Sequence, residues 1–199
     1  MSEKYTLASE PLKDEHEVIL RMLRVLEVAS SKVEKGDHVP TEVFTNVVDF
    51  IRTFADQCHH GKEQDTLFPL MGKRGIPTHG GPIAVMLMEH DEGRRLAKSM
   101  ADSIDGYEAG DKARARTLIE SARNYASLLQ QHIYKEDNIL YPMGDRVLTP
   151  QDNKELLEQF ERIEERVIGE GKHEYYLNMV TGLERELGIV GGKPAHAQH

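Results

Sequence analysis

The chain has no tryptophan, a single cysteine and few aromatic residues, and these shortages exclude several classes of protein. The lone thiol, Cys58, cannot form a disulfide within the chain, unlike the cysteine frameworks of small secreted domains. With aromatic residues at 6% of the chain, no platform for stacking nucleic-acid bases is evident. At 199 residues, one domain can bury a core without a disulfide or metal staple.

Long apolar runs and an excess of positive charge are also missing. No run approaches the roughly 20 apolar residues of a membrane-spanning helix, and residues 1–13 are polar, unlike a secretory signal peptide. The formal net charge of −9 disfavours binding to nucleic acid or to an anionic membrane. We therefore predict a cytoplasmic protein without nucleic-acid or membrane partners, and the sequence identifies no protein partner.

What the chain does contain is many histidines, ten in all, some of them in a repeated motif. His59-x-x-x-Glu63, followed by Leu-Phe-Pro, recurs as His132-x-x-x-Glu136, followed by Leu-Tyr-Pro. On an α-helix, residues four apart share a face, so each histidine points the same way as its glutamate. The repeat predicts two helices that carry equivalent polar groups.

A shorter pair of motifs, Glu-His-Glu and Glu-His-Asp, precedes the two copies. The histidine of the first, His16, lies 43 residues before the first repeat histidine. The histidine of the second, His90, lies 42 residues before the second repeat histidine. Two near-copies of a helix pair would place imidazoles and carboxylates around one pseudo-twofold axis, as in bundles that hold two metals in their core.

Apolar residues spaced at i, i+3 and i+4 predict four long helices joined mostly by short connections, with further helices after Pro150. The second is expected to end at about Leu67, because Pro69 disfavours helical geometry at the preceding residue, and the fourth at Tyr141. The predicted fold is all-α, an antiparallel up-down four-helix bundle with a C-terminal helical appendage. The predicted divisions are the bundle at 10–145, a helical extension at 146–190 and a disordered tail at 191–199.

All four predicted bundle helices aim polar side chains at one level of the core. His60 lies three residues before Glu63 and so reaches the same region, although its counterpart in the repeat is the apolar Ile133. The alternative for His60 is a polar residue at the rim of the bundle. The candidate metal ligands are His16, His59, His60, Glu63, His90, His132 and Glu136.

Each candidate alone has an ordinary structural interpretation. A single histidine on an apolar stripe is usually a satisfied core residue, and a single HxxxE is common as a surface pair. The repeated set is different, because buried carboxylates and imidazoles without a neighbouring lysine or arginine on the same stripe need cations. Imidazole with carboxylate suits iron, zinc, copper or manganese. Iron is our first choice, and zinc is not excluded.

In combination, these motifs resemble the hemerythrin-like (HHE cation-binding) family over about residues 10–145. The resemblance implies a four-helix bundle with two iron ions, oxo- or hydroxo-bridged, that binds O2 or handles NO or peroxide. It implies that Glu63 and Glu136 bridge the ions. One iron would take His16 with His59, and the other His90 with His132.

The chain departs from the oxygen-carrier pattern of that family. The position four residues before His90 is Met86 rather than histidine, so His60 is the candidate for the missing imidazole. Glu136 also stands four residues after the last ligand histidine, where the carriers have an aspartate five residues after it. These departures disfavour reversible O2 carriage.

Three functions remain open from the sequence. The first is a di-iron protein for O2, peroxide or NO, with peroxide-decomposing (catalase-like) or oxidase activity. The second is an oxygen, iron or redox sensor that signals through its C-terminal helices, and the third is a structural metal bundle. For the first, Tyr125 is expected either to line a ligand pocket or to be a core tyrosine. Gly93 and Ala97 are expected either to leave room for a channel or to allow close helix packing.

Overall fold

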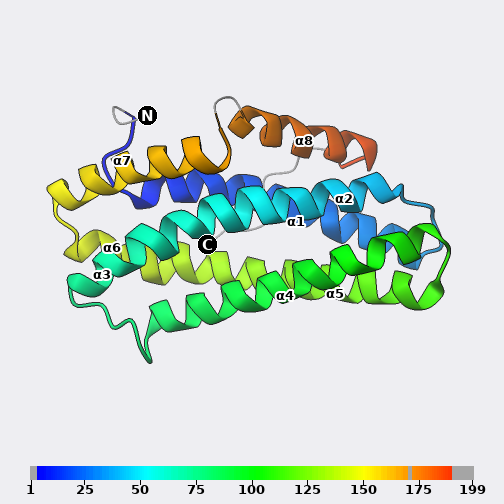
Figure 1. Ribbon diagram of the computed structural model, residues 1–199, viewed down its shortest axis with the longest axis horizontal. Coiled ribbons are helices and arrows are strands. Elements are labelled where there is room, and N and C mark those ends of the chain that lie inside the picture. The colour runs from blue at the N-terminus through cyan, green and yellow to red at the C-terminus, as the bar shows by residue number, and fades with distance from the viewer. Residues whose placement is uncertain (1–3, 170–171, 190–199) are drawn as a thin grey trace.

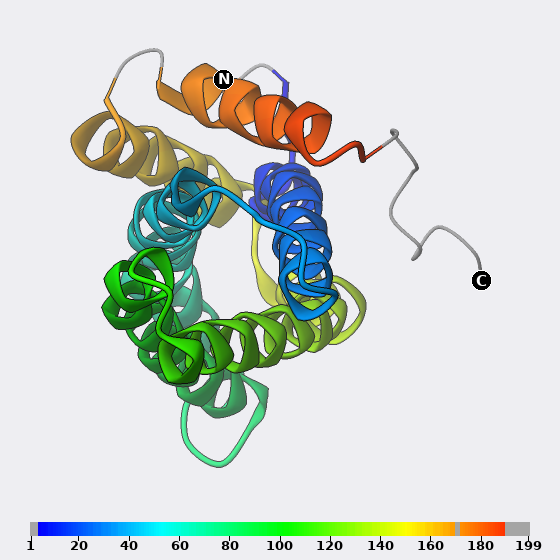
Figure 2. The same cartoon turned by 90° about the vertical axis from the view of Figure 1, so that its right-hand side faces the viewer.

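The computed structural model describes residues 4–169 and 172–189, and within these ranges the regular secondary structure is helical, without strands. Four long helical rods run antiparallel (Figure 1) and surround a common core when viewed end-on (Figure 2). The first rod is α1 (Ser9–Glu34) and the third is α4 (Pro82–Glu108). Both contact the second and fourth rods, so the rods form a closed square. The predicted all-α up-down bundle is confirmed.

The second rod is longer than the sequence predicts, because it passes through its proline instead of ending before it. Its last α-helical part continues to Lys73, six residues beyond the predicted end at Leu67. The rod consists of α2 (Thr41–Phe50), the π-helical segments η1 (Ile51–His60) and η2 (Glu63–Leu67), and α3 (Phe68–Lys73).

The fourth rod repeats this arrangement and also corrects a prediction, since it continues past Tyr141 to Val147. It consists of α5 (Lys112–Lys135), the π-helical segment η3 (Glu136–Leu140) and α6 (Tyr141–Val147). A proline ring in an α-helix clashes with the carbonyl four residues earlier. Here the turn just before each proline is widened, with the Phe68 N–H donating to the Glu63 carbonyl and the Tyr141 N–H to the Glu136 carbonyl. The wider turn accommodates the ring, and the helix continues.

The core of the bundle is divided by a polar layer. One apolar cluster fills the end that contains Ile19 and Leu129, and a second fills the end that contains Leu12 and Leu140. Between Leu12 and Ile19 on α1 lies the buried His16. The HxxxE motifs lie at the same level on the second and fourth rods, so the predicted ligands lie between the two apolar clusters.

The C-terminal helices α7 (Pro150–Val167) and α8 (Lys172–Glu186) lie outside the bundle (Figure 2). α7 packs against η1 and η2, while α8 packs against α1 and α2. Arg21 holds α8 to α1 through a two-pronged bond to the Glu184 carboxylate, at 3.0 and 2.7 Å. The division between bundle and extension stays a prediction, and the predicted tail at 191–199 lies outside the described residues.

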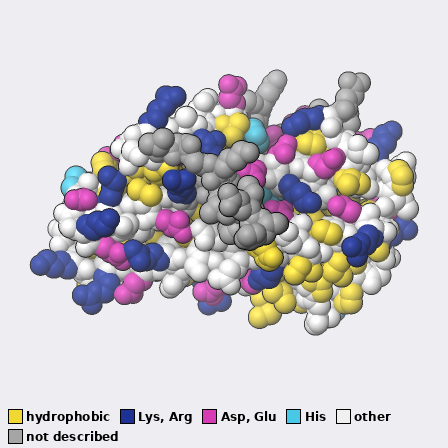
Figure 3. Space-filling view, turned by 180° about the vertical axis from the view of Figure 1, so that it is seen from behind, with side chains coloured by type: hydrophobic (Ala, Val, Ile, Leu, Met, Phe, Trp, Pro, Cys, Tyr) yellow, Lys and Arg dark blue, Asp and Glu magenta, His cyan; other side chains and the backbone are white. Residues whose placement is uncertain are grey.

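The surface seen in Figure 3 carries acidic and basic side chains in alternation, and apolar side chains gather toward one end of this face. Across the residues described here, none of the helices has both the length and the apolar character needed to span a membrane. The polar layer is not a surface feature, because its histidines and glutamates are buried.

Candidate metal centre

The seven side chains predicted as ligands meet in the polar layer. α1 supplies His16, α4 supplies His90, and the two HxxxE motifs supply the rest from the second and fourth rods. All are at most 3% exposed. The structure therefore brings together every candidate ligand that the sequence analysis named: His16, His59, His60, Glu63, His90, His132 and Glu136.

Four of the imidazoles form two pairs. The Nε2 atoms of His16 and His59 are 3.0 Å apart, and the Nε2 atoms of His90 and His132 are also 3.0 Å apart. Two nitrogens that bind one cation at about 2.1 Å, at right angles, would lie about 3.0 Å from each other. Each pair therefore has the spacing of two ligands that share an ion.

The two carboxylates each lie between the pairs. Glu63 Oε2 is 3.9 Å from His59 Nε2 and 3.5 Å from His90 Nε2. Glu136 reaches the other two imidazoles, with Oε2 3.3 Å from His16 Nε2 and Oε1 3.2 Å from His132 Nε2. Each glutamate thus touches one histidine of each pair, which is the placement that a bridging carboxylate requires.

His60 belongs to the His90 side of the layer. Its ring stacks on His90, with centroids 3.8 Å apart and an angle of 16° between the rings. Its exposure of 3% does not fit the alternative of a polar residue at the bundle rim. The potential ligand atoms fall into two groups, each within 4.8 Å: His60, Glu63, His90 and His132 in one, and His16, His59 and Glu136 in the other.

Several buried polar atoms in this layer lack a hydrogen-bond partner within the described part of the chain: His60 Nε2, Glu63 Oε2, and both Oε1 and Oε2 of Glu136. Such atoms are costly to bury unless something else satisfies them. Burial and the charge of Glu136 raise the pKa of Glu63 well above its usual value, because two adjacent buried carboxylates resist ionising together. A mixed imidazole and carboxylate set with free lone pairs fits iron, zinc or manganese.

A shell of acidic and basic residues that the sequence analysis missed surrounds the repeat histidines. The Nδ1–H of His59 donates to Glu15 at 2.8 Å, and that of His132 donates to Glu89 at 2.9 Å. Each of these carboxylates also accepts a hydrogen bond from a lysine, Lys62 or Lys135 respectively. The signal was present in the sequence, because both copies read His-x-x-Lys-Glu and both short motifs begin with glutamate.

The remaining two paired imidazoles are held by the residues that follow the motif glutamates. The Nδ1–H of His16 donates to Asp137 Oδ1 at 2.8 Å, and Gln64 Nε2 lies 2.6 Å from His90 Nδ1. Carboxylate partners on Nδ1 fix the ring orientation and leave Nε2 free to bind a metal. Three of the four paired imidazoles have such a partner.

Tyr141 breaks the symmetry of the layer, and its role also escaped the sequence analysis. Its hydroxyl donates to Glu63 Oε1 at 2.7 Å, whereas the equivalent residue in the first copy is Phe68. Burial and the adjacent charge of Glu136 raise the pKa of Tyr141 well above its usual value, so the hydroxyl keeps its proton. The sequence did contain a sign of this difference, because the first motif has Phe68 where the second has Tyr141.

A cavity of about 140 Å³ reaches His60 and His90 from between the second and third rods. Gly93, Ala97 and Tyr125 line it, so the two small residues do leave space. Tyr125 and Ala97 are also buried members of the apolar core, so for Tyr125 both expected roles hold. Arg94 and Asp56, also in the lining, are joined by an ion pair with Nε 2.9 Å from Oδ1. The cavity can lead only small molecules toward the polar layer.

Comparison with known proteins matches residues 7–144 to the hemerythrin HHE cation-binding domain. The chain is 25% identical over 182 residues to the uncharacterized protein Rv1995 of Mycobacterium tuberculosis, covering 92% of this chain and 71% of that protein. It is 25% identical over 135 residues to the iron-sulfur cluster repair protein YtfE of Pectobacterium atrosepticum, covering 66% and 61%. No solved structure matches the chain. Since the domain match spans most of its length, the protein belongs to the hemerythrin HHE cation-binding family.

Proposed function

We propose that the protein is a non-haem di-iron protein that binds or processes O2, peroxide or NO. The observation that carries this proposal is the position of Glu63 and Glu136, each between the two imidazole pairs. His16 and His59 would hold one iron, and both glutamates would bridge to the second. The second iron would take His60, His90 and His132.

Iron would supply one-electron redox chemistry and a binding position for a small molecule. The chain supplies the surroundings. The apolar clusters on either side of the layer exclude bulk water, and Tyr141 holds the Glu63 carboxylate by its hydrogen bond. The relationship to an iron-sulfur cluster repair protein supports iron as the metal.

The size of the access cavity supports a diatomic molecule or peroxide as the ligand. A volume of about 140 Å³ is below the roughly 300–1,000 Å³ of pockets for larger organic ligands. The unequal imidazole sets, three on one side and two on the other, favour reaction with a ligand over a symmetric structural site. We propose either peroxide decomposition or an oxidase reaction as the activity.

A sensor is the second candidate, and one observation favours it. The appendage helix α7 contacts the surroundings of the metal layer through Glu164, which accepts a hydrogen bond from the buried Lys62. A change at the metal centre therefore has a route to the C-terminal helices.

Metal analysis by mass spectrometry tests the proposed centre, using untagged protein from iron-replete cells. We expect about two irons per chain and an absorption spectrum that responds to peroxide or NO. Glu136→Ala is expected to lower the iron content, whereas Glu165→Gln, an exposed charge change on α7, is the control. Folded protein that carries only zinc, or that keeps two irons without any spectral response, would contradict the proposal.

A further inference from the structure

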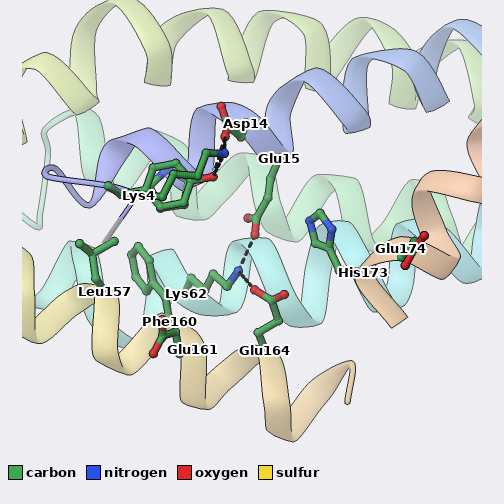
Figure 4. Close-up of a pocket in the computed structure, with 12 residues that line it drawn as sticks. Lys4, Asp14, Glu15, Lys62, Leu157, Phe160, Glu161, Glu164, His173 and Glu174 are labelled. Atoms are coloured by element: carbon green, nitrogen blue, oxygen red, sulfur yellow. Dashed lines mark hydrogen bonds and ion pairs between the residues drawn. The ribbon is translucent and has the colours of Figure 1, made fainter. Parts of the chain in front are cut away.

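A second cavity, of about 420 Å³, lies in the seam between the bundle and α7 (Figure 4). Pro11, Leu157 and Phe160 provide apolar lining, and Lys62, Glu15 and Glu164 are among the charged residues around it. Lys62 is only 1% exposed, which is unusual for a lysine. A buried ammonium group must be paired, so its partners carry information about its role.

Lys62 joins the appendage to the metal layer through an unbroken series of polar contacts. Its ammonium group donates to Glu164 Oε2 on α7 at 3.1 Å and to Glu15 Oε1 on α1, as Figure 4 shows. The other oxygen of Glu15, Oε2, accepts from the Nδ1–H of His59 at 2.8 Å. The series therefore runs Glu164, Lys62, Glu15, His59, and its last member is a predicted metal ligand.

The central carboxylate of this series depends on the lysine. Glu15 is buried, at 4% exposed, and its carboxylate accepts hydrogen bonds from the Lys62 ammonium group and the His59 Nδ1–H, so it needs both partners. An anionic partner on Nδ1 orients a ligand imidazole and increases its basicity toward a metal. A shift of Lys62 would consequently change the environment of His59.

The other half of the pseudo-symmetric site contains a natural comparison. Lys135 donates to Glu89, which accepts from His132, so the inner part of the series is the same. The Lys135 side chain, however, is 32% exposed, whereas that of Lys62 is 2% exposed beside α7. α7 packs on η1 and η2, the segments on either side of Lys62. Helix α7 thus covers the lysine of the first motif copy, Lys62, but leaves the equivalent Lys135 partly exposed.

We propose that Glu164 is a positioning residue that holds His59 through Lys62 and Glu15, and thereby couples α7 to one imidazole pair. The functional consequence of this coupling rests on the proposed function, because it requires a metal bound at His59. Because coupling between two sites is reciprocal, a metal at His59 would change the stability of α7, and displacement of Glu164 would change metal binding at His59.

Histidine-ring NMR of the full chain tests the coupling directly, in metal-free and Zn²⁺-loaded protein. Glu164→Gln is expected to shift the His59 ring signals and to leave those of His132 in place. Glu165→Gln is the matched control, because it removes the same charge from the neighbouring, exposed position. Unmoved His59 signals in Glu164→Gln, or equal shifts at His59 and His132, would overturn the proposal.

Zinc affinity and hydrogen exchange give a second, independent readout. Loss of a direct partner of a ligand commonly weakens metal binding about 10–100-fold, so we expect a several-fold loss at one of two zinc sites in Glu164→Gln. Zn²⁺ should also protect α7 amides from exchange in the original chain and less so in the variant. If the original chain and Glu164→Gln show the same Zn²⁺ affinity and the same protection of α7 amides, the coupling is refuted. If neither protein binds metal, the proposed function fails, while the metal-free NMR spectra still decide the coupling.

Discussion

At the residue scale, histidines of the polar layer carry protons at the positions where a cation would bind. Burial opposes the charged form of His132, but Glu136 and Glu89 outweigh it and raise its pKa to about 9. The pKa of His16 is also raised, because the nearby carboxylates of Asp137 and Glu136 outweigh the effect of burial. The metal-free protein near neutral pH thus carries protons that a metal must displace.

The first prediction is that metal binding releases protons and strengthens with pH. At pH 7 His132 lies below its raised pKa of about 9 and is protonated, so binding must remove that proton. The apparent affinity for Zn²⁺ should therefore rise from pH 7 to about 9 and level off above it. Titration calorimetry in two buffers of different ionisation enthalpy measures the release, and a pH-independent affinity would contradict the assignment.

The second prediction concerns Tyr141. Replacing it by phenylalanine leaves Glu63 Oε1 without its donor in a buried site, which should cost about 1–3 kcal/mol of unfolding free energy in the metal-free protein. We also expect an altered iron absorption spectrum. Tyr125→Phe is the control, since it removes a hydroxyl from the cavity lining and leaves the Tyr141–Glu63 hydrogen bond in place. Denaturant unfolding and absorption spectroscopy give the comparison, and identical behaviour of the two variants would refute the role.

Sequence reasoning found the inner layer but not its surroundings. Six of the seven inner candidates are repeated between the two halves of the bundle, so their convergence followed from helix geometry and the bundle fold. His60, whose counterpart is Ile133, was placed by its spacing to Glu63. The sequence analysis assigned no role to Glu15 or Lys62, and the contact of Lys62 with Glu164 joins residues about 100 positions apart in the sequence. A closer comparison of the two copies would have identified them, since the lysine before each motif glutamate is repeated.

At the element scale, the prolines of the two motifs produced the main error. The rule that a residue before proline leaves the helical region predicts an end at Leu67. The rod instead widens into a π-helical segment at Glu63–Leu67 and continues, and the fourth rod does the same at Glu136–Leu140. Such segments occur often at functional sites. Both begin at the proposed bridging glutamates.

The third prediction concerns the start of α7. Thr149 caps this helix and forms a capping box with Asp152, whose carboxylate is also bound by Arg74 in two places, at 2.9 and 2.7 Å. Thr149→Ala should reduce stability by about 1 kcal/mol and increase amide exchange first in α7. Thr45→Ala, at an exposed position inside α2, is the control. Exchange that increases uniformly across the bundle would contradict a local capping role.

At the scale of the whole molecule, the bundle was predictable and the placement of the appendage was not. The four rods follow from apolar spacing, since each must bury one stripe against its neighbours. The position of α8 against α1 depends on long-range contacts such as that of Arg21 with Glu184. Local sequence patterns do not predict such contacts. Within the described residues, the polar layer is therefore approached by a small cavity between the second and third rods and by the α7 contact with Lys62.

The last prediction tests whether the cavity beside His60 and His90 is the entry route for small ligands. A Cβ built on Gly93 would lie 3.5 Å from Tyr125 Cε2 and 3.6 Å from Leu129 Cδ2, which are ordinary contact distances. Gly93→Ala should therefore fit and leave ligand entry nearly unchanged, whereas the longer side chain of Gly93→Leu should fill part of the 140 Å³ space.

We expect Gly93→Leu to slow the association of azide with the iron-loaded protein, as followed by stopped-flow absorption, without changing the metal content. Overpacking of the site could cost about 1–3 kcal/mol, so unfolding is measured in parallel to confirm that both variants are folded at the assay temperature. Slower association in the leucine variant alone would establish this side of the bundle as the route. Equal rates in Gly93→Ala and Gly93→Leu would mean that ligands reach the layer elsewhere, and the cavity at the seam with α7 would then be the next route to block.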